Sequence, residues 1–345
     1  MVAILEKVSL KAYNSLALPA VAEFFCAVRD PAELLAALEF ARCKNLDLTP
    51  LGGGSNIVLA GDIAGLVLSV ELKGVSHRLL GPVVEVTFAA GENWHDQVLN
   101  CLQQGWYGLE NLSLIPGNMG AAAIQNIGAY GVELADLFVS LSAIDKHSGE
   151  AVKFDKAACE FGYRDSLFKN AGRDRYIIVD ITLALSTAPQ INIQYPALQA
   201  AIDEHAGSAA EFDSKVTPEL VSAMVCQIRS SKLPDPKVIP NAGSFFKNPI
   251  VPQAQALELS RQYPSMPAYA QINGDSKVPA GWLIEQCGFK GAVRGPVGVH
   301  QQQALVLVNT GGGSGAQLLA LAEEVRVGVL QRFGIDLEIE PRVYG

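Results

Sequence analysis

Two short segments of the chain carry residue types that could do chemistry together. The first, residues 242–249, reads AGSFFKNP and presents the Ser244 hydroxyl directly after a glycine. The second, residues 52–56, reads GGGSN, and its glycines let backbone N–H groups approach an anion without a Cβ in the way. This segment predicts a pyrophosphate cradle, with a plain turn as the alternative, and its expected contacts are Gly52, Gly53, Gly54, Ser55 and Asn56. A large nucleotide cofactor beside a proton-handling hydroxyl indicates an enzyme.

A second glycine-rich segment, residues 115–131, reads IPGNMGAAAIQNIGAYG. Its small residues allow the backbone to pack close to a flat ligand, and the side-chain amides of Gln125 and Asn126 can form hydrogen bonds with the edge of a heterocycle. A buried connection is the alternative for this segment alone, but both segments together favour a bound dinucleotide. The contacts expected here are Ile115, Pro116, Gly117, Gly120, Ala121, Gln125, Asn126, Gly128, Ala129, Tyr130 and Gly131.

Five cations are candidates for binding an anionic ligand, namely Arg164, Arg229, Lys232, Lys237 and Lys247. Arg164, in the string GYRDS, offers a fork of donors for a negatively charged oxygen, with a surface Arg–Asp pair as the alternative. Arg229 and Lys232 lie at the end of a predicted helix and suit a diphosphate, with ordinary compensation of the helix dipole as the alternative.

The remaining polar motifs are less specific. Ser244 has no G-x-S-x-G surroundings, which disfavours a hydrolase nucleophile and leaves a turn-capping serine as the alternative. Glu338 and Glu340 alternate on one side of a predicted strand, where a solvated edge is the default. Residues 305–316 imitate strand–G-x-G-x-x-A–helix, but too little chain follows to complete a nucleotide-binding half. The five histidines show no metal-binding spacing, so we expect no metal site.

Composition bounds the class of protein. A chain of 345 residues suits two or three domains. Its net charge of −9 argues against nucleic acid or a membrane surface as partner. The six cysteines form no C-x-x-C pair, and we identify neither a signal peptide nor a membrane span, so we expect a cytoplasmic protein.

Periodicity and capping signals predict mixed β and α elements, with a domain boundary near residues 190–210. One helix is expected to begin at the cap Asp30, and others are expected at residues 93–104, 156–161, 217–232, 253–263, 280–287 and 314–333. Asn93 is the expected cap of the helix at 93–104, and Ser314 with Gln317 forms an expected capping box. Strands are expected at residues 48–51, 63–70, 83–89, 137–146, 151–154, 176–185, 191–194, 304–308 and 335–340.

Taken in order, seven strings across nearly the whole chain resemble the UDP-N-acetylenolpyruvoylglucosamine reductase family, also called UDP-N-acetylmuramate dehydrogenases. The resemblance is to the longer form of this family, in which the proton donor is a serine and a loop carries a tyrosine that covers the substrate. The strings are GGGSN, IPG…IQNIGAYGVEL, FGYRDS, KLPDP, NAGSFFKNP, AGWLIEQ and HQQQALVLVN. The resemblance implies an α+β chain with a two-lobed FAD-binding domain of the vanillyl-alcohol-oxidase/p-cresol-methylhydroxylase type and a C-terminal α/β substrate-binding domain. The FAD domain would cover residues 18–188, with lobes of about 18–72 and 73–188, and the second domain residues 210–345.

The resemblance also implies an activity and site residues. NADPH would reduce FAD, and hydride from the flavin N5 would then pass to C3 of UDP-N-acetylglucosamine enolpyruvate, giving UDP-N-acetylmuramate for peptidoglycan precursor synthesis. Ser244 would protonate C2, with Arg164 and Glu340 as its catalytic partners. The residues expected to bind substrate are Tyr195, Arg229, Lys232, Asn248 and Gln303.

Two other functions remain open from the residues. One is a non-catalytic protein that binds a flavin or nucleotide sugar, and the other is a sugar-alcohol oxidase of the same flavin superfamily, which would consume oxygen without NADPH. For the reductase, small molecules are the only expected partners, and we expect a monomer.

Overall fold

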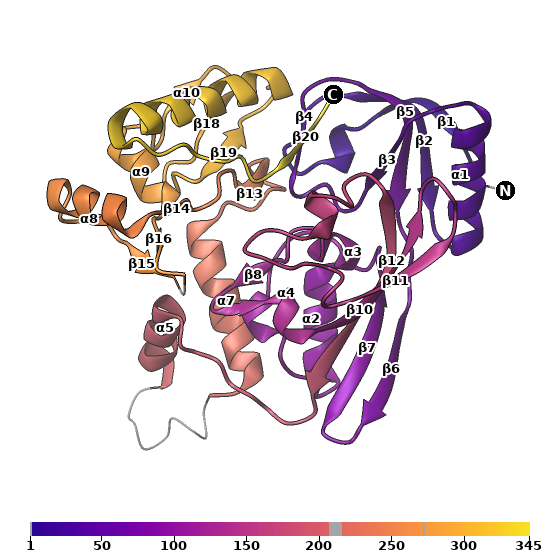
Figure 1. Cartoon of the computed structure of the whole chain (residues 1–345), viewed down its shortest axis with the longest axis horizontal. Helices are drawn as coiled ribbons and strands as arrows, with labels where there is room; N and C mark the ends of the chain where they lie inside the picture. The colour runs from indigo at the N-terminus through magenta and orange to yellow at the C-terminus, as the bar shows by residue number, and fades with distance from the viewer. Residues whose placement is uncertain (1, 207–215, 272) are drawn as a thin grey trace. The chain divides into compact units, whose positions relative to one another are not determined.

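The computed structural model describes residues 2–206, 216–271 and 273–345 (Figure 1). They form two compact units, each assembled from separate stretches of the chain. The first contains the described residues of 1–8, 22–53 and 64–231, and the second contains those of 9–21, 54–63 and 232–345. These units divide the chain differently from the expected domain limits of 18–188 and 210–345, which stay a prediction. Residues 207–210 of the expected boundary lie outside the described residues.

The first unit begins with a four-stranded sheet in the order β1-β2-β5-β3, in which β3 and β5 are parallel. Its strands are β1 (Leu5–Ser9), β2 (Val21–Val28), β3 (Leu48–Leu51) and β5 (Ile63–Val70). The β5 sequence is almost continuously apolar because nearly all of it is buried. Helix α1 (Pro31–Cys43) begins where expected, since the Asp30 side chain accepts a hydrogen bond from the Glu33 backbone N–H at 2.8 Å. Leu34, Ala37, Leu38 and Ala41 of this helix are buried, while Leu35 is exposed.

The second sheet of this unit is antiparallel and has the order β11-β10-β12-β7-β6. Its strands are β6 (Val75–Leu80), β7 (Val83–Ala89), β10 (Phe138–Asp145), β11 (Ala151–Asp155) and β12 (Tyr176–Ser186). Alternate residues of β7, namely Val84, Val86 and Phe88, are fully buried, as a strand with one core face requires. Helix α2 (Trp94–Gln103) follows, capped by the expected Asn93 side chain.

The glycine-rich segment of this unit is built from very short elements. They are η2 (Glu110–Leu112), α3 (Met119–Ala122), β8 (Gly128–Ala129), β9 (Val132–Glu133) and α4 (Leu134–Leu137). Further along the chain, η3 (Leu167–Lys169) precedes β12, and helices α5 (Pro196–Ala206) and α7 (Pro218–Lys232) pack their apolar faces together. The glycine-rich segment is therefore ordered by local elements.

The second unit contains the sheet β13-β19-β18-β17, against which helix α10 (Gly315–Phe333) packs (Figure 1). The strands are β13 (Asn241–Ser244), β17 (Val293–Arg294), β18 (Val297–Val299) and β19 (Val306–Asn309). Ser314 and Gln317 form the expected capping box of α10. Strand β4 (Ile57–Leu59) pairs in parallel with β20 (Arg342–Tyr344), which joins an early segment to the end of the chain. The other elements are η1 (Lys11–Tyr13), β14 (Ile250–Val251), α8 (Gln253–Gln262), β15 (Tyr269–Ala270), β16 (Ser276–Lys277) and α9 (Ala280–Gln286).

Three expected elements are wrong. Residues 156–161 form turns, because Glu160 adopts a left-handed φ of 49° that no helix continues. Residues 191–194 are not a strand, and the Asn192 carbonyl accepts a hydrogen bond from the Asn111 side chain. Residues 335–340 keep the expected alternation of burial, but the ladder contact assigned to them is a single bridge between Ile339 and Phe246. Among the described residues, no helix is long and apolar enough to cross a membrane.

Candidate functional site

The two glycine-rich segments meet in the first unit. A Cβ on Gly53 would lie 3.1 Å from the Gly117 Cα and 3.0 Å from Asn118 Oδ1. A Cβ on Gly52 would lie 3.4 Å from the Ala121 Cβ. Because Gly52 and Gly53 are also exposed, their backbone stays accessible to a ligand. The segments that were predicted to share a dinucleotide are thus neighbours in space.

Gly54 belongs to the second unit and has a different task. Its φ is +62°, and a Cβ there would lie 2.0 Å from the Tyr13 carbonyl oxygen. Only glycine fits this position without moving the backbone. Gly54 is buried, so it shapes the turn, while Ser55 and Asn56 are half-buried and lead into β4. The Asn56 carbonyl accepts a hydrogen bond from the Arg342 N–H at 3.0 Å.

Backbone hydrogen bonds hold the 117–120 segment against the second sheet. The Gly117 carbonyl accepts from the Trp94 N–H, and the Gly120 N–H donates to the Ala90 carbonyl, both at 3.0 Å. A Cβ on Gly120 would lie 2.5 Å from the Ala90 Cβ, so this contact requires glycine. Upstream, His95 Nδ1 accepts a hydrogen bond at 3.0 Å from the backbone N–H of Leu114, whose φ is +58°. These bonds and contacts fix the backbone conformation of the segment.

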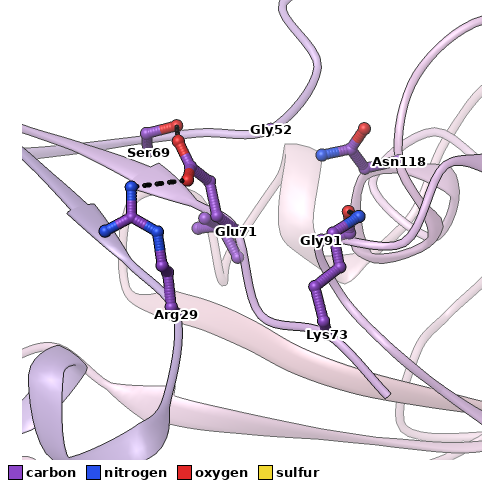
Figure 2. A pocket seen from close by; sticks show the side chains of 8 residues that line it. Arg29, Gly52, Ser69, Glu71, Lys73, Gly91 and Asn118 are labelled. Carbon is purple, nitrogen blue, oxygen red and sulfur yellow. Dashed lines mark hydrogen bonds and ion pairs between the residues drawn. The ribbon is translucent and has the colours of Figure 1, made fainter. Parts of the chain in front are cut away.

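A cavity of about 390 Å³ adjoins this cradle and includes Gly52 and Asn118 in its lining (Figure 2). Arg29 forms an ion pair of 3.2 Å with Glu71, which also accepts from Ser69 Oγ at 3.2 Å. On the opposite side, Lys73 Nζ donates to the Gly91 carbonyl at 2.6 Å.

Three charged residues of the cavity, Arg29, Glu71 and Lys73, were not predicted from the sequence. Their position could have identified them, because Arg29 directly follows β2, and Glu71 and Lys73 follow β5. Polar residues that come immediately after buried strands line sites at sheet edges.

Arg164 lies beside Gly128. Its Nη2 donates to the Gly128 carbonyl at 2.6 Å, and a Cβ on Gly128 would lie 3.1 Å from Nη1. Glycine at position 128 thus lets the guanidinium lie flat against the backbone. Arg164 itself has a left-handed φ of 53°, which is uncommon for a residue with a Cβ. Asp165, the acid of the Arg–Asp pair considered from the sequence, accepts from the Ser166 N–H and from Asn170 Nδ2, both at 3.0 Å.

Arg229 provides a second cation in the first unit, on α7. Its Nε is buried and has no hydrogen-bond partner among the residues that the structure describes. Burial lowers the pKa of Arg229; Tyr130 and Cys226 oppose this shift, and the charge of Arg164 adds to it. A buried guanidinium nitrogen without a partner is costly, so Arg229 is suited to receive an anion from a ligand.

Two tyrosines accompany this arginine. The rings of Tyr130 and Tyr195 meet edge to face, with centroids 5.2 Å apart. Burial raises the pKa of Tyr130, while Arg229 lowers it. Tyr195, expected from the resemblance to contact substrate, is 46% exposed and therefore accessible to a ligand.

Ser244 and Glu340 occupy neighbouring segments of the second unit. Ser244 ends β13 and pairs with Val306 of β19 across an irregularity in register, directly after Gly243 with its φ of +71°. The Glu340 N–H donates to the Phe245 carbonyl at 2.9 Å, so position 340 lies beside the residue that follows Ser244. Ser244 and Glu340 are both half-buried.

Glu338 has a different environment from Glu340. It is exposed and forms a 2.5 Å ion pair with Lys247. The solvated-edge interpretation therefore suits Glu338, while the backbone of Glu340 is bonded to the segment that follows β13.

Two expected substrate residues converge on the start of α9. Asn248 Oδ1 accepts a hydrogen bond from the Ala280 N–H at 2.9 Å. Gln303 Oε1 lies 3.2 Å from the place that a Cβ on Gly281 would take. Lys232 is exposed at the end of α7. These residues belong to the second unit, as do Ser244 and Glu340.

Several predicted cofactor residues line or flank the glycine-rich segment. Ala129 pairs with Val132 in the β8–β9 hairpin, and Gly131 is exposed at its turn with a φ of +83°. The other partly or fully exposed members are Ile115, Pro116, Gly117, Ala121, Gln125 and Gly128. Asn126, which is only 1% exposed, and Gly120 are buried.

The segment at residues 305–316, which resembles a strand–G-x-G-x-x-A–helix motif, contains a turn stabilised by the Asn309 side chain. Asn309 Oδ1 accepts hydrogen bonds from the N–H groups of Gly311 and Gly313, at 3.1 and 3.0 Å. These amides are therefore engaged within the protein, which supports the interpretation as a surface loop before a capped helix. Among the described residues, no cluster of histidines, cysteines and acids could hold a metal ion.

The cradle in the first unit fits a dinucleotide. Gly52 and Gly53 are exposed and carry no side chain, so their backbone N–H groups can reach an anionic group such as a pyrophosphate. A Cβ on Gly53 would also crowd Gly117 and Asn118. Residues 22–155, which include the cradle, match the model of the FAD-binding domain family. Residues 235–344, which include Ser244 and Glu340, match the model described as the C-terminal domain of UDP-N-acetylenolpyruvoylglucosamine reductase. Fold and site thus define an FAD-binding oxidoreductase, and the expected α+β fold class is confirmed.

Relatives over nearly the full length narrow this class. The chain is 46% identical to the UDP-N-acetylenolpyruvoylglucosamine reductase of Pseudomonas aeruginosa, over 98% of both chains. It is 48% identical to that of Ralstonia nicotianae, over 96% of both chains. The crystal structure of the Thermus caldophilus reductase is similar over the whole of both chains, with a TM-score of 0.68 and 22% identity. The chain belongs to the UDP-N-acetylenolpyruvoylglucosamine reductase family.

Proposed function

We propose that the protein reduces UDP-N-acetylglucosamine enolpyruvate to UDP-N-acetylmuramate in peptidoglycan precursor synthesis, with FAD as cofactor and NADPH as reductant. The observation that carries this proposal is the 45–48% identity to reductases of this name over 95% or more of each chain. The paired glycine-rich segments support FAD as the cofactor. NADPH as the reductant rests on the family resemblance.

FAD held by the two glycine-rich segments would supply the hydride-transfer chemistry between NADPH and C3 of the enolpyruvyl group. Addition of hydride at C3 leaves a basic carbon at C2, next to the carboxylate. Ser244 is proposed to donate its hydroxyl proton to C2. A serine is a poor acid in water, so this role depends on the strong basicity of that carbon.

The cations and Glu340 are proposed to manage negative charge. Arg164 would bind the carboxylate of the substrate, where a guanidinium offers two parallel donors. Glu340 would assist the proton transfer from Ser244, which lies on the neighbouring segment. Arg229, with its unpartnered buried Nε, is suited to the diphosphate. The other residues proposed to bind the substrate are Tyr195, Lys232, Asn248 and Gln303.

A monomeric state and a cytoplasmic location complete the proposal. All six cysteines are unpaired, which agrees with a reducing compartment. Neither feature bears on the chemistry proposed above, and sedimentation of the purified protein would test the first.

The proposal predicts that Ser244→Ala separates the two half-reactions. NADPH should still bleach the flavin absorbance at the wild-type rate, because that step needs no proton from Ser244. Reoxidation by the enolpyruvyl substrate should fall by about 100-fold or more, the range typical of a lost general acid. Stopped-flow absorbance, first with NADPH and then with substrate, measures both rates in one protein.

Lys247→Ala is a matched control, because Lys247 lies on the same segment and its charge is paired with the exposed Glu338. This variant should keep both half-reactions. A Ser244→Ala protein that is reoxidised by substrate at the normal rate would show that another group supplies the proton. If oxygen but not the enolpyruvyl substrate reoxidises the wild-type flavin, the protein is an oxidase instead.

A further inference from the structure

Asn126 lies at the centre of a hydrogen-bond network that ends at Arg164. Its Nδ2 donates to the Gly162 carbonyl at 3.0 Å and to Glu133 Oε2 at 2.8 Å. Its Oδ1 accepts from the Ala135 N–H at 2.9 Å. A side-chain amide has two N–H donors, and both of those of Asn126 are used inside the protein. The residue is 1% exposed, so it offers almost no surface to a flavin.

The bond to the Gly162 carbonyl anchors one end of the turn that carries Arg164. Gly162 and Asp165 close this turn with reciprocal backbone hydrogen bonds of 3.0 and 3.2 Å. Its far end is held by Ser166, whose Oγ donates to the Ile124 carbonyl at 2.7 Å. Asn126 and Ser166 therefore attach both ends of the turn to the 124–135 segment.

The same segment also receives the Arg164 side chain. The guanidinium donates to the Gly128 carbonyl, two residues beyond Asn126. Glu133, which accepts from Asn126, also caps α4 together with Asp136. The amide of Asn126 thus joins the backbone of the Arg164 turn to the hairpin on which its guanidinium rests.

Strained backbone makes this attachment necessary. Arg164 has a φ of 53° and Asn126 a φ of 44°, both in the left-handed region that costs a residue with a Cβ. Asparagine is one of the few residues that tolerate this conformation. Without the bond from Asn126, the turn keeps its closing bonds and its attachment through Ser166 but loses its anchor at Gly162, which allows the guanidinium to shift.

We propose that Asn126 is a positioning residue for Arg164, rather than a direct contact of the flavin as the sequence led us to expect. This inference rests on the proposed function, because it takes Arg164 as the group that binds the substrate carboxylate. Its consequence is that Asn126 governs the reaction with substrate and not the retention of FAD.

The variant Asn126→Asp tests this role with almost no change in shape. The ionised carboxylate of this variant keeps the acceptor for Ala135, but it places an oxygen against the Gly162 carbonyl and against Glu133. Burial beside Glu133 raises the pKa of a carboxyl at position 126, but even the protonated form has one O–H for the two acceptors that Asn126 serves, so the paired attachment is lost in either protonation state. FAD content per protein and the rate of flavin reduction by NADPH should stay at wild-type values. Reoxidation by substrate should slow by about tenfold, the effect of one lost hydrogen bond on a reacting geometry.

The double variant Asn126→Asp with Glu133→Gln separates positioning from folding. The amide introduced at position 133 can donate to the carboxylate introduced at position 126, which removes the repulsion and restores that bond. The Gly162 carbonyl keeps its bond from the Asp165 N–H but still lacks one from position 126. We expect the melting temperature to recover in the double variant and the reoxidation rate to stay low. Glu133→Gln alone is the matched control and should be reoxidised normally, since its amide oxygen can still accept from Asn126.

A double-mutant cycle with Arg164→Ala completes the test. If Asn126 acts through Arg164, Asn126→Asp should cause no further slowing once Arg164 is removed. Loss of bound FAD in Asn126→Asp, normal reoxidation, or full additivity with Arg164→Ala would each overturn the inference while the wild-type activity stands. A wild-type protein that the substrate cannot reoxidise would overturn the proposed function and this inference together.

Discussion

At the scale of single residues, the polar side chains of the site differ in whether their N–H donors have hydrogen-bond partners within the protein. Asn126 uses both donors within the protein, whereas the buried Nε of Arg229 has no partner among the described residues. A residue type alone does not distinguish these cases, because both carry planar N–H donors. The difference arises from neighbours that are distant in sequence, such as Gly162, which the sequence could not bring to Asn126.

His95 links the site to pH at the same scale. Burial lowers its pKa below the ordinary value of 6.5, with the charge of Arg229 acting in the same direction and that of Asp96 against it. The neutral ring accepts the Leu114 N–H at Nδ1, and protonation would end this bond. Because the pKa is depressed in the folded state, its contribution to stability is complete above pH 6.5 and is lost as the pH falls through the lowered pKa.

We therefore predict that acid destabilises the protein partly through His95. The variant His95→Asn places a non-titrating acceptor near the position of Nδ1. Between about pH 7 and pH 5, the melting temperature of the wild type should fall more steeply than that of the variant. Differential scanning fluorimetry at a series of pH values gives both slopes, and parallel slopes would refute a contribution from His95.

At the scale of elements, the success of sequence reasoning depended on how local the signal was. Helices α1, α2 and α10 begin at the side chains expected to cap them, namely Asp30, Asn93 and Ser314. A cap satisfies backbone groups three residues away, so its signal lies within the sequence window. The strand expected at residues 335–340 has the right alternation, but a strand also needs a ladder partner, which a short window does not contain.

The close packing of α3 against the end of β7 is expected to be required for FAD binding, and this can be tested. Gly120→Ala would place a Cβ 2.5 Å from the Ala90 Cβ, closer than two carbon atoms can approach. The segment 117–121 should shift away from the sheet and from Gly52 and Gly53. We predict that the purified variant retains less FAD than the wild type, while its secondary structure by circular dichroism is unchanged.

Ala122→Gly is a useful comparison, since it also alters α3 but adds no atom. It should lower stability by about 1 kcal/mol without the steric effect. If Gly120→Ala binds FAD as tightly as the wild type, close packing of α3 is not needed for the cradle.

At the scale of the whole molecule, the order of the motifs along the chain suggested two successive domains. The distribution of chain segments between the two units was not predictable from the sequence. The two glycine-rich segments precede the Ser244 segment, as a cofactor domain followed by a substrate domain would require. The structure nevertheless assigns residues 9–21 and 54–63 to the second unit. Parallel pairing of β4 with β20 and the bond from Asn309 Nδ2 to the Leu16 carbonyl explain this, and both join early segments of the chain to late ones. Contacts at such separation leave no local trace in the sequence.

Binding of FAD should stabilise this molecule in a way that locates the cradle. A ligand that binds only the folded state, at a concentration about 100 times its Kd, adds about 2.7 kcal/mol to the free energy of unfolding. FAD added to protein stripped of flavin should therefore raise the melting temperature by several degrees. Riboflavin should have little effect, because it lacks the pyrophosphate that the N–H groups of Gly52 and Gly53 are expected to bind. In hydrogen exchange, FAD should protect residues 52–53 and 117–121, and protection confined to the second unit would place the cofactor elsewhere.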